Sequence, residues 1–466
     1  MPMWSKALSK PGQEFSRTVL PLLQGQIPTR LRGTLYRNGP ARLSRGGQRV
    51  GHWFDGDGAI LGVYFTDEGV HALYRYVQTQ GYRAETQSES FLFPNYGMSA
   101  PGAFWNSWGK DPKNTANTSV LIASDRILAL WEGGMPHALN LDTLETYGID
   151  DLGGLGGNQP FSAHPKIDSV TGEIFNFGIT PGPKSTLNLY KCDRRGRIKQ
   201  KNGFPLEGLP LVHDFALAGD YLVFFISPVR VNLLQALFGF KSFSDAMEWQ
   251  PGSGTQILVF DRTDLSLVSR TLTDSWYQWH FTNGFVDGFG NINICFVRYE
   301  DFRSNQYLKE VAGGETKTNA PGRLWELVLD PIKGKIIRNE RLHDRACEFP
   351  VVSGDSVGQP WRYTYLAIHE ETDTHVQPEL LVNLACFDHE KRILSIGSVE
   401  KNCYPSEPIL VPGEEGGWIL TVVYNGNCDR SEVRIYPADN IGADPICTLA
   451  LPEVIAPGFH GTWRGS

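Results

Sequence analysis

The sequence predicts an all-β fold, a β-propeller of about seven blades with a few helices and loops that cap one face. Three observations lead to this prediction. Short apolar or alternating runs bounded by turn residues, such as "GAILGVYF", "YLVFFI" and "WILTVVY", recur along the whole chain. The 50 Gly and 29 Pro are spread throughout, which is typical of many turns and few long helices. Candidate site residues also recur about every 59 residues between His164 and His460, close to the length of one four-stranded unit.

The same repeat favours a single domain over residues 1–466, in which residues 1–30 form an N-terminal extension. A propeller has to close its ring, commonly by joining terminal strands in one blade, because an open edge strand is prone to unwanted pairing. The strand that follows His460 is therefore expected to be buried near the axis. Only two segments have a helical pattern, residues 15–25 and residues 231–249.

Composition excludes several classes of function. The chain is 41% hydrophobic and 20% charged, as in ordinary soluble globular proteins, and its formal net charge of −8 argues against nucleic acid as a partner. Seven Cys without a Cys-x-x-Cys pair predict reduced thiols and a cytoplasmic location. The sequence has no signal peptide pattern, dinucleotide fingerprint, Walker loop or Gly-x-Ser-x-Gly elbow, and nothing in it marks an obligate protein partner.

Four of the 11 His differ from the others in their setting. They lie among aromatic or apolar neighbours in or beside predicted strands: His164 in "FSAHPK", His213 in "LVHDFA", His280 in "YQWHFTNG" and His460 in "PGFHGTW". The remaining histidines, such as His369 in a charged stretch, are expected to be surface histidines or hydrogen-bonded core histidines rather than metal ligands. A buried imidazole needs a partner for its nitrogens. If each of the four belongs to the innermost strand of a different blade, they converge on the axis and can hold one metal ion.

Imidazole suits iron, zinc, copper and nickel, so the ligand type alone does not identify the metal. Octahedral iron with four nitrogens would keep two positions for dioxygen and substrate. Three glutamates, Glu132, Glu348 and Glu407, stand in strand contexts where a lone buried carboxylate is costly. They are candidates to accept the second N–H of metal-bound histidines, and the alternative is that they are partly exposed charges at strand ends.

A series of motifs resembles the carotenoid cleavage oxygenases, and among them the bacterial apocarotenoid oxygenases most. The motifs follow the order of that family from about Gln24 to the end of the chain. They are "GTLYRNGPA", "HWFDGDGAI", "LALWEGGMPHAL", "FSAHPK", "HDFA", "WHFTNGF", "CEFPVV", "SEPILVP" and "GFHGTW".

The resemblance implies a seven-bladed propeller with a non-haem Fe(II) on its axis. His164, His213, His280 and His460 fall on the iron-ligand positions of the family, and Glu132, Glu348 and Glu407 fall on the positions of their carboxylate partners. Thr118 matches a residue whose methyl group crowds one open iron position, although an ordinary strand threonine is an equal alternative. Phe54 and Trp131 are the expected residues of a substrate tunnel. The family's first histidine lacks a fixed carboxylate partner, which agrees with three glutamates for four rings.

Residues 231–240, "VNLLQALFGF", place apolar side chains on one side of a predicted helix, among them Leu234, Leu237 and Phe238. The segment is too short to span a bilayer, but it could dip into one leaflet, and the family uses such a patch to collect lipid-soluble substrate. The alternative is an ordinary core helix. The sequence thus predicts a cytoplasmic protein with peripheral membrane contact.

By resemblance, the predicted activity is the oxidative cleavage of a conjugated C=C bond of an apocarotenoid by O2. The expected bond is 15,15′, which gives retinal, and cleavage at another bond such as 9,10 is an alternative. A second alternative keeps the iron and changes the substrate to stilbenes or phenylpropenes. A third is a propeller that serves as an interaction scaffold, which would leave four apolar-context histidines without a reason.

Overall fold

The computed structural model describes residues 2–157, 159–182, 184–370, 379–413 and 416–466. Strands hold 45% of the chain and helices 9%, which confirms the all-β prediction. The inner strands β17 (Tyr221–Ile226) and β23 (Ile292–Tyr299) are almost continuously apolar, and they are buried on both faces. The outer strand β15 (Ile198–Leu206) alternates between exposed and half-buried residues, because only one of its faces meets a neighbouring sheet.

Three sheets come from the first 206 residues and the end of the chain. The first has the order β1-β7-β6-β3-β34, with β1 (Phe15–Val19), β3 (Gly33–Arg42), β6 (Asp57–Thr66), β7 (Gly69–Tyr76) and β34 (Gly461–Gly465). The second contains β8 (Ser119–Ala123), β9 (Arg126–Leu130), β10 (His137–Leu139) and β11 (Thr146–Ile149) in sequential order. The third contains β12 (Lys166–Ile167), β13 (Ile174–Thr180), β14 (Ser185–Cys192) and β15.

The rest of the chain forms two larger sheets. One has the order β21-β20-β17-β16-β22-β23-β24-β25-β26-β27-β28, in which the strands not yet bounded are β16 (Ala216–Ala218), β20 (Thr255–Asp261), β21 (Leu267–Thr273), β22 (Tyr277–Val286), β24 (Arg323–Asp330), β25 (Lys335–Val351), β26 (Tyr363–Ile368), β27 (Asn383–Asp388) and β28 (Ile393–Ile396). The other has the order β2-β33-β32-β31-β29 with β30 beside β31, from β2 (Leu22–Gly25), β29 (Cys403–Pro405), β30 (Ile409–Val411), β31 (Trp418–Asn425), β32 (Arg430–Pro437) and β33 (Cys447–Ala450).

Short pairs and helices complete the fold. The two-stranded pairs are β4 (Ser44–Arg45) with β5 (Gln48–Arg49), and β18 (Val229–Val231) with β19 (Met247–Trp249). The helices are α1 (Gln80–Ser88), α2 (Leu233–Leu237), α3 (Arg303–Gly313) and the 3-10 turns η1 (Met3–Leu8), η2 (Trp53–Asp55), η3 (Phe104–Ser107), η4 (Pro251–Ser253) and η5 (Gly354–Ser356).

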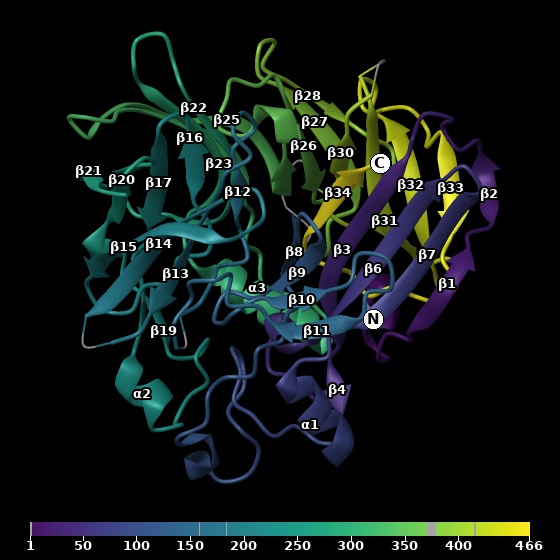
Figure 1. Ribbon diagram of the computed structural model, residues 1–466, viewed down its shortest axis with the longest axis horizontal. Coiled ribbons are helices and arrows are strands. Elements are labelled where there is room, and N and C mark those ends of the chain that lie inside the picture. The colour runs from purple at the N-terminus through teal and green to yellow at the C-terminus, as the bar shows by residue number, and fades with distance from the viewer. Residues whose placement is uncertain (1, 158, 183, 371–378, 414–415) are drawn as a thin grey trace.

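The chain passes once around a centre. From β3, β6 and β7 at the right of Figure 1 it runs through β8–β11 below, β12–β21 at the left and β22–β28 above, and it returns to the right with β31–β33. No sheet closes on itself among the described residues. The two ends of the chain meet, because β34 pairs with β3 from Gly33↔Gly465 to Arg37↔Gly461, while β2 pairs with β33. The helix α2 and the loop that carries η3 lie together at the foot of the molecule in the view of Figure 1.

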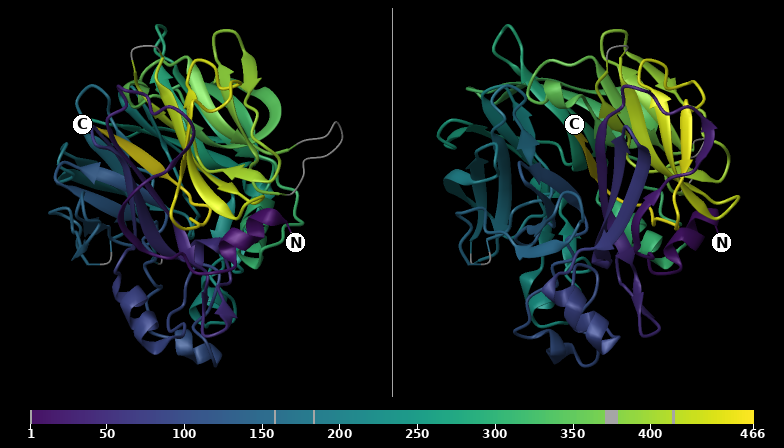
Figure 2. Two further views of the ribbon diagram at one scale, coloured as in Figure 1. Left: turned by 90° about the vertical axis from the view of Figure 1, so that its right-hand side faces the viewer. Right: turned by 45° about the vertical axis from the view of Figure 1, so that its right-hand side comes forward.

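The N-terminal residues are incorporated into the fold. The helical prediction for residues 15–25 is wrong, because β1 pairs with β7 and β2 pairs with β33. The β-branched residues of "FSRTV" favour a strand, and Pro21 has no N–H to continue a helix. In Figure 2, η1 lies as a short purple helix at the N-terminus. Its Trp4 is fully buried in the same cluster as Tyr404 and Phe459.

The other helix prediction is also corrected. Within residues 231–249 only α2 is α-helical, and β18 and β19 flank it as a hairpin, because the Gly and Ser residues after Phe238 stop the helix. The sequence pattern did not predict α1, whose start is capped by the Thr79 side chain through the Tyr82 N–H at 3.0 Å. It also missed α3, which buries one face at Val311 and Ala312.

A ring of four buried charges holds α1 and the loop after η3 against the first sheet. The Lys113 Nζ lies 2.8 Å from a Glu85 carboxylate oxygen and 3.0 Å from an Asp57 oxygen, and the Arg45 guanidinium is 2.8 Å from the other Asp57 oxygen. Each of these side chains is at most 2% exposed. Positive and negative charges alternate around the ring, so its formal charge is zero.

Candidate metal centre and cavity

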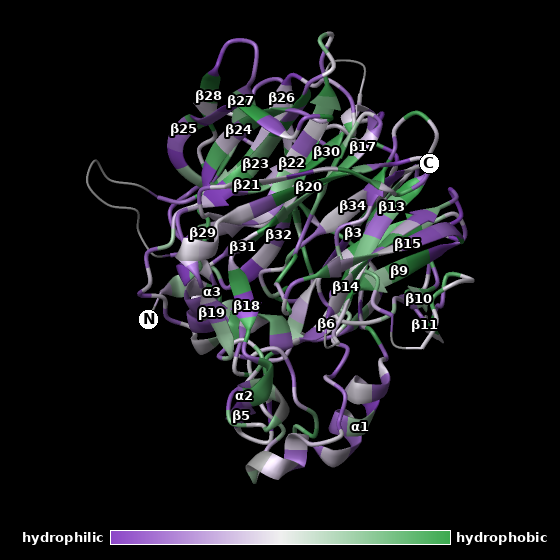
Figure 3. Ribbon diagram, turned by 90° about the vertical axis from the view of Figure 1, so that its left-hand side faces the viewer, coloured by the Kyte–Doolittle hydropathy of each residue, from purple (hydrophilic) through white to green (hydrophobic). Residues whose placement is uncertain are grey.

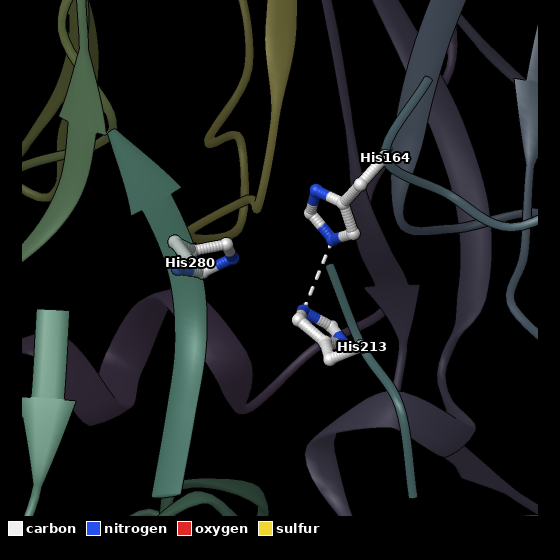
Figure 4. Close-up of side chains that lie close together, drawn as sticks. All are labelled: His164, His213 and His280. Atoms are coloured by element: carbon white, nitrogen blue, oxygen red, sulfur yellow. Dashed lines mark hydrogen bonds between the residues drawn. The ribbon is translucent and has the colours of Figure 1, made fainter. Parts of the chain in front are cut away.

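Four histidines from different parts of the fold meet at the centre of the molecule. His164 lies just before β12, His213 before β16, His280 on β22, and His460 directly before β34. The His164 ring centroid is 4.4 Å from that of His213, 5.2 Å from that of His280 and 4.8 Å from that of His460. Figure 4 shows three of these rings turned toward one another.

The ring nitrogens of these histidines point inward. The Nε2 atoms of His164 and His213 are 3.0 Å apart, and the Nε2 of His280 is buried without a hydrogen-bond partner in the described part of the chain. One nitrogen from each of these three residues lies within 4.8 Å of the others. Buried imidazole nitrogens that face one another fit a shared metal ion of the iron, zinc, copper or nickel type. His460 stands outside that group of three but packs on His164 and His280, with ring centroids 4.8 Å from each.

The three predicted glutamates contact three of the four rings. A carboxylate oxygen of Glu348 is 2.5 Å from Nδ1 of His280, and one of Glu407 is 2.8 Å from Nδ1 of His460. The Glu132 carboxylate contacts Nδ1 of His213. In each pair the carboxylate binds the nitrogen that faces away from the cluster, which fixes the ring orientation and leaves Nε2 to face the centre.

Burial and neighbouring charges set the protonation of the rings. Burial, together with the other three histidines, holds the pKa of His164 well below its usual value, so its imidazole is neutral at ordinary pH. Burial also lowers the pKa of His460, although Glu407 opposes that shift. For His280 burial lowers the pKa, but the charge and hydrogen bond of Glu348 outweigh burial and raise it overall.

An aromatic cavity opens beside the cluster. His213, His280 and His460 line it, and so do the predicted residues Phe54 and Thr118. The Phe54 ring lies parallel to that of His213 at 6.4 Å between centroids. Trp131 is not among the lining residues of this cavity, because its ring folds over Gly133 and Gly134 in the turn after β9. The Thr118 hydroxyl donates to Oδ1 of Asn117 at 3.1 Å, so its methyl group remains as the apolar part of the side chain.

Sequence patterns missed several cavity residues. Trp279 and His280 are consecutive on β22, yet both line the cavity, because the register of β22 against β23 shifts between Gln278 and Phe281. Phe349 follows Glu348 with a left-handed backbone (φ 52°), which is strained for a bulky residue. Its ring packs on His280 at 5.6 Å and on His460 at 5.4 Å. His369 is a buried, hydrogen-bonded histidine, which is one of the two expected settings, and the charged sequence around it gave no sign that it lines the cavity.

The predicted apolar patch is exposed in part. Leu234 and Phe238 are 68% and 48% exposed, and the side chain of Leu237 lies outside the described part of the structure. The exposed ring of Trp108 joins them, because its Nε1–H donates to the Phe238 carbonyl at 3.0 Å. Figure 3 colours α2 as hydrophobic at the foot of the molecule. Among the described residues no helix has the length and apolar character needed to cross a membrane.

Fold and site together define a class: a mostly β protein with a buried all-histidine candidate metal centre beside an aromatic cavity. The family model described as RPE65, retinal pigment epithelial membrane protein, matches residues 8–465. The chain therefore belongs to this family of carotenoid oxygenases, and the resemblance found in its motifs is confirmed.

Similar proteins agree with the family. The chain is 33% identical to an apocarotenoid-15,15'-oxygenase of Synechocystis, over 99% of this chain and 96% of the relative. It is 28% identical to an isoeugenol monooxygenase of Pseudomonas putida, over 95% and 94% of the two chains. A crystal structure of cobalt-substituted Synechocystis ACO superposes with a TM-score of 0.90 at 32% identity, covering 100% of this chain and 98% of that one.

Proposed function

We propose that the protein is an iron-dependent dioxygenase that cleaves a conjugated C=C bond of apocarotenoids, at the 15,15′ position, to give retinal. The convergence of four histidines, three of them backed by glutamates, at an aromatic cavity carries this proposal. The similar apocarotenoid-15,15'-oxygenase supports the substrate and the bond. Such a reaction adds one O2 across the double bond and yields two carbonyl products.

The protein side chains bind and orient. Ferrous iron, held by Nε2 of His164, His213, His280 and His460, would supply the site at which dioxygen is activated. The three glutamates keep the Nδ1 protons of their histidines directed away from the centre and balance positive charge in a site of low dielectric. The Thr118 methyl group narrows the space beside the histidines and restricts what can approach there.

The cavity holds the polyene in register and excludes water. Phe54 packs on His213, Trp279 and Phe459, so it forms the wall next to the cluster. Because a rigid conjugated chain slides along its own axis, side chains such as Phe54 and Phe349 decide which double bond lies beside the histidines. Trp131, by its position next to Glu132, would act on an approach to the cluster outside this cavity.

The activity is tested with anaerobically purified protein. Elemental analysis is expected to give about one iron per chain, and incubation of this protein with apocarotenals and apocarotenols in air should give retinal, identified by product mass. Protein that contains no iron and takes up no Fe(II) would contradict the proposed oxygenase activity. The hypothesis of an interaction scaffold would then remain. Products of cleavage at 9,10 would support a polyene-cleaving dioxygenase but would contradict the proposed 15,15′ position.

Stilbenes and phenylpropenes belong in the same substrate panel, because an isoeugenol monooxygenase is among the similar proteins. Turnover of resveratrol or isoeugenol without turnover of apocarotenals would reverse the preferred substrate. Turnover of either substrate class is consistent with the candidate metal centre.

We also propose that residues 1–466 form one domain, a seven-bladed propeller with residues 1–30 as the extension that helps to close it. The 11-stranded sheet divides naturally into three blades. Its β16 and β22 meet at a single parallel pair, Ala218↔Gly284, and β25 pairs with β24 in its first part and with β26 in its last residues. With the other four sheets of four or more strands, this gives seven.

Peripheral membrane attachment of a cytoplasmic protein is proposed through the patch of Leu234, Leu237, Phe238 and Trp108. The exposed apolar side chains and the amphipathic start of the segment support it. Replacing Leu237→Glu and Phe238→Glu together should lower the bound fraction in liposome flotation, because two buried charges would be costly at the acyl boundary. The exposed apolar residue Phe289, in the loop between β22 and β23, provides the matched control as Phe289→Glu. Unchanged partitioning of the double variant would contradict the attachment.

A further inference from the structure

Asp214, the residue after His213, is a buried carboxylate with three partners. Its side chain is 1% exposed. Oδ1 lies 2.8 Å from Nζ of Lys166 and accepts the N–H of Phe215 at 2.7 Å. Oδ2 accepts the backbone N–H of Phe281 at 2.8 Å.

These partners stand next to three different histidines. Lys166 follows His164 by two residues, Asp214 itself follows His213, and Phe281 follows His280. Lys166 belongs to β12 of the third sheet, whereas Phe281 belongs to β22 of the 11-stranded sheet. No backbone pairing joins these two sheets in the described part of the chain. One carboxylate therefore bridges two sheets directly behind the histidine cluster.

We infer that Asp214 is a positioning residue that holds the segments of His164, His213 and His280 at the spacing that a metal ion requires. The inference rests on the proposed metal centre and adds a residue that contacts none of the imidazoles. It acts through the backbone of Phe281 and through the Lys166 side chain, so its effect is on the separation of the segments.

His164 depends most on this bridge. Among the described residues no carboxylate contacts its ring, in contrast to the other three histidines. Its own backbone N–H reaches the Ser162 hydroxyl at 3.3 Å, a contact within the same segment. The Lys166–Asp214 pair is thus the charged link that joins the His164 segment to the residues next to His213 and His280.

The charge of Asp214 is essential to the bridge. A carboxylate can accept from Lys166 and from both backbone N–H groups at once. An Asn side chain has one acceptor oxygen, and its NH2 group would have to face a backbone N–H or the Lys166 ammonium. The change Asp214→Asn therefore keeps the shape of the side chain but breaks one side of the bridge.

A matched control exists four residues after His164. Asp168 is also 1% exposed and pairs with Arg262 at 3.1 Å, and its cationic partner is 17% exposed, against 20% for Lys166. The Asp168 side chain contacts Arg262 and Thr171 and neither Asp214 nor Phe281, so Asp168→Asn removes a buried pair of the same kind without touching the bridge.

The test compares Asp214→Asn, Lys166→Met and Asp168→Asn with the unchanged protein, using Fe(II) and Co(II) as probes. Outer partners of metal ligands are typically worth about 10–100-fold in metal affinity, and we expect a loss in that range for Asp214→Asn and a smaller loss for Lys166→Met. At saturating Co(II), the d–d absorption spectrum of Asp214→Asn should be shifted, which records altered ligand geometry. Asp168→Asn should keep both the affinity and the spectrum.

Thermal unfolding of the metal-free proteins separates positioning from folding. If Asp214→Asn and Asp168→Asn lose similar stability and only Asp214→Asn loses affinity, the positioning role holds. Equal affinities and spectra for Asp214→Asn and the unchanged protein would overturn the inference. Failure of the unchanged protein to bind Fe(II) or Co(II) would instead overturn the proposed function.

Discussion

His460→Ala is expected to lower Fe(II) affinity by more than about 100-fold and to abolish turnover. Loss of an outer partner alone typically costs about 10–100-fold, so loss of a ligand should exceed that range. Glu407 would lose its imidazole partner, but its other oxygen would keep the Gly461 N–H at 2.8 Å, so the local backbone should persist. Iron titration and product analysis with apocarotenals measure the two effects.

Two further variants define the His460 result. Deleting residues 458–466 should also abolish Fe(II) binding and turnover. It should in addition lower the stability of the fold, because β3 loses its pairing with β34. His71→Ala serves as the control, since His71 lies on β7 away from the cluster, and it should leave iron content and turnover unchanged. A truncated protein that still cleaves its substrate would contradict the assignment of His460.

Lys113→Met is expected to destabilise the metal-free protein by about 3–5 kcal/mol, because it leaves a buried negative charge without compensation. Burial lowers the pKa of Lys113, but Asp57 and Glu85 outweigh burial and raise it, so the ammonium is charged at neutral pH. Removing it leaves two carboxylates and one guanidinium in the ring that also contains Arg45. Urea-induced unfolding measures the loss.

Two control variants test whether the lost stability comes from the unbalanced charge in the ring. The double change Lys113→Met and Glu85→Gln restores a neutral ring and should recover part of the lost stability. Lys309→Met removes a Lys from an exposed pair with Asp245, whose side chains are 33% and 43% exposed, and should change stability by less than about 1 kcal/mol. An equal loss for Lys113→Met and Lys309→Met would show that the ring contributes no more than a surface pair.

The histidines and glutamates of the candidate metal centre were easier to predict from the sequence than the shape of the cavity. A histidine or glutamate among apolar neighbours conflicts locally with its surroundings, and that conflict is visible in the sequence at His280 and Glu348. Asp214 stands in the same apolar run as His213, but the sequence gave no sign of its role, because its partners Lys166 and Phe281 become neighbours only when two sheets pack together. Phe349 faces the cluster through a left-handed backbone, which no periodicity encodes.

Helices were predicted poorly for a related reason. The run in residues 15–25 is apolar enough for either helix or strand, and only pairing with β7 and β33 decides between them. The helix α3 is mostly polar at the sequence level, and its small buried face at Val311 and Ala312 is defined by packing against the N-terminal cluster around Trp4.

The pairing of β3 with β34 has a consequence for synthesis of the protein. Arg42 ends β3 and Gly461 begins β34, so the ribosome must add more than 400 residues after β3 before the strand that pairs with its second edge exists. At a translation rate of roughly 5–20 residues per second, the inner edge of the first sheet stays unpaired for a time on the order of a minute. During that interval β3 exposes unpaired backbone groups while most later sheets form. Nascent chains that stall before β34 are therefore expected to be the species most dependent on chaperones.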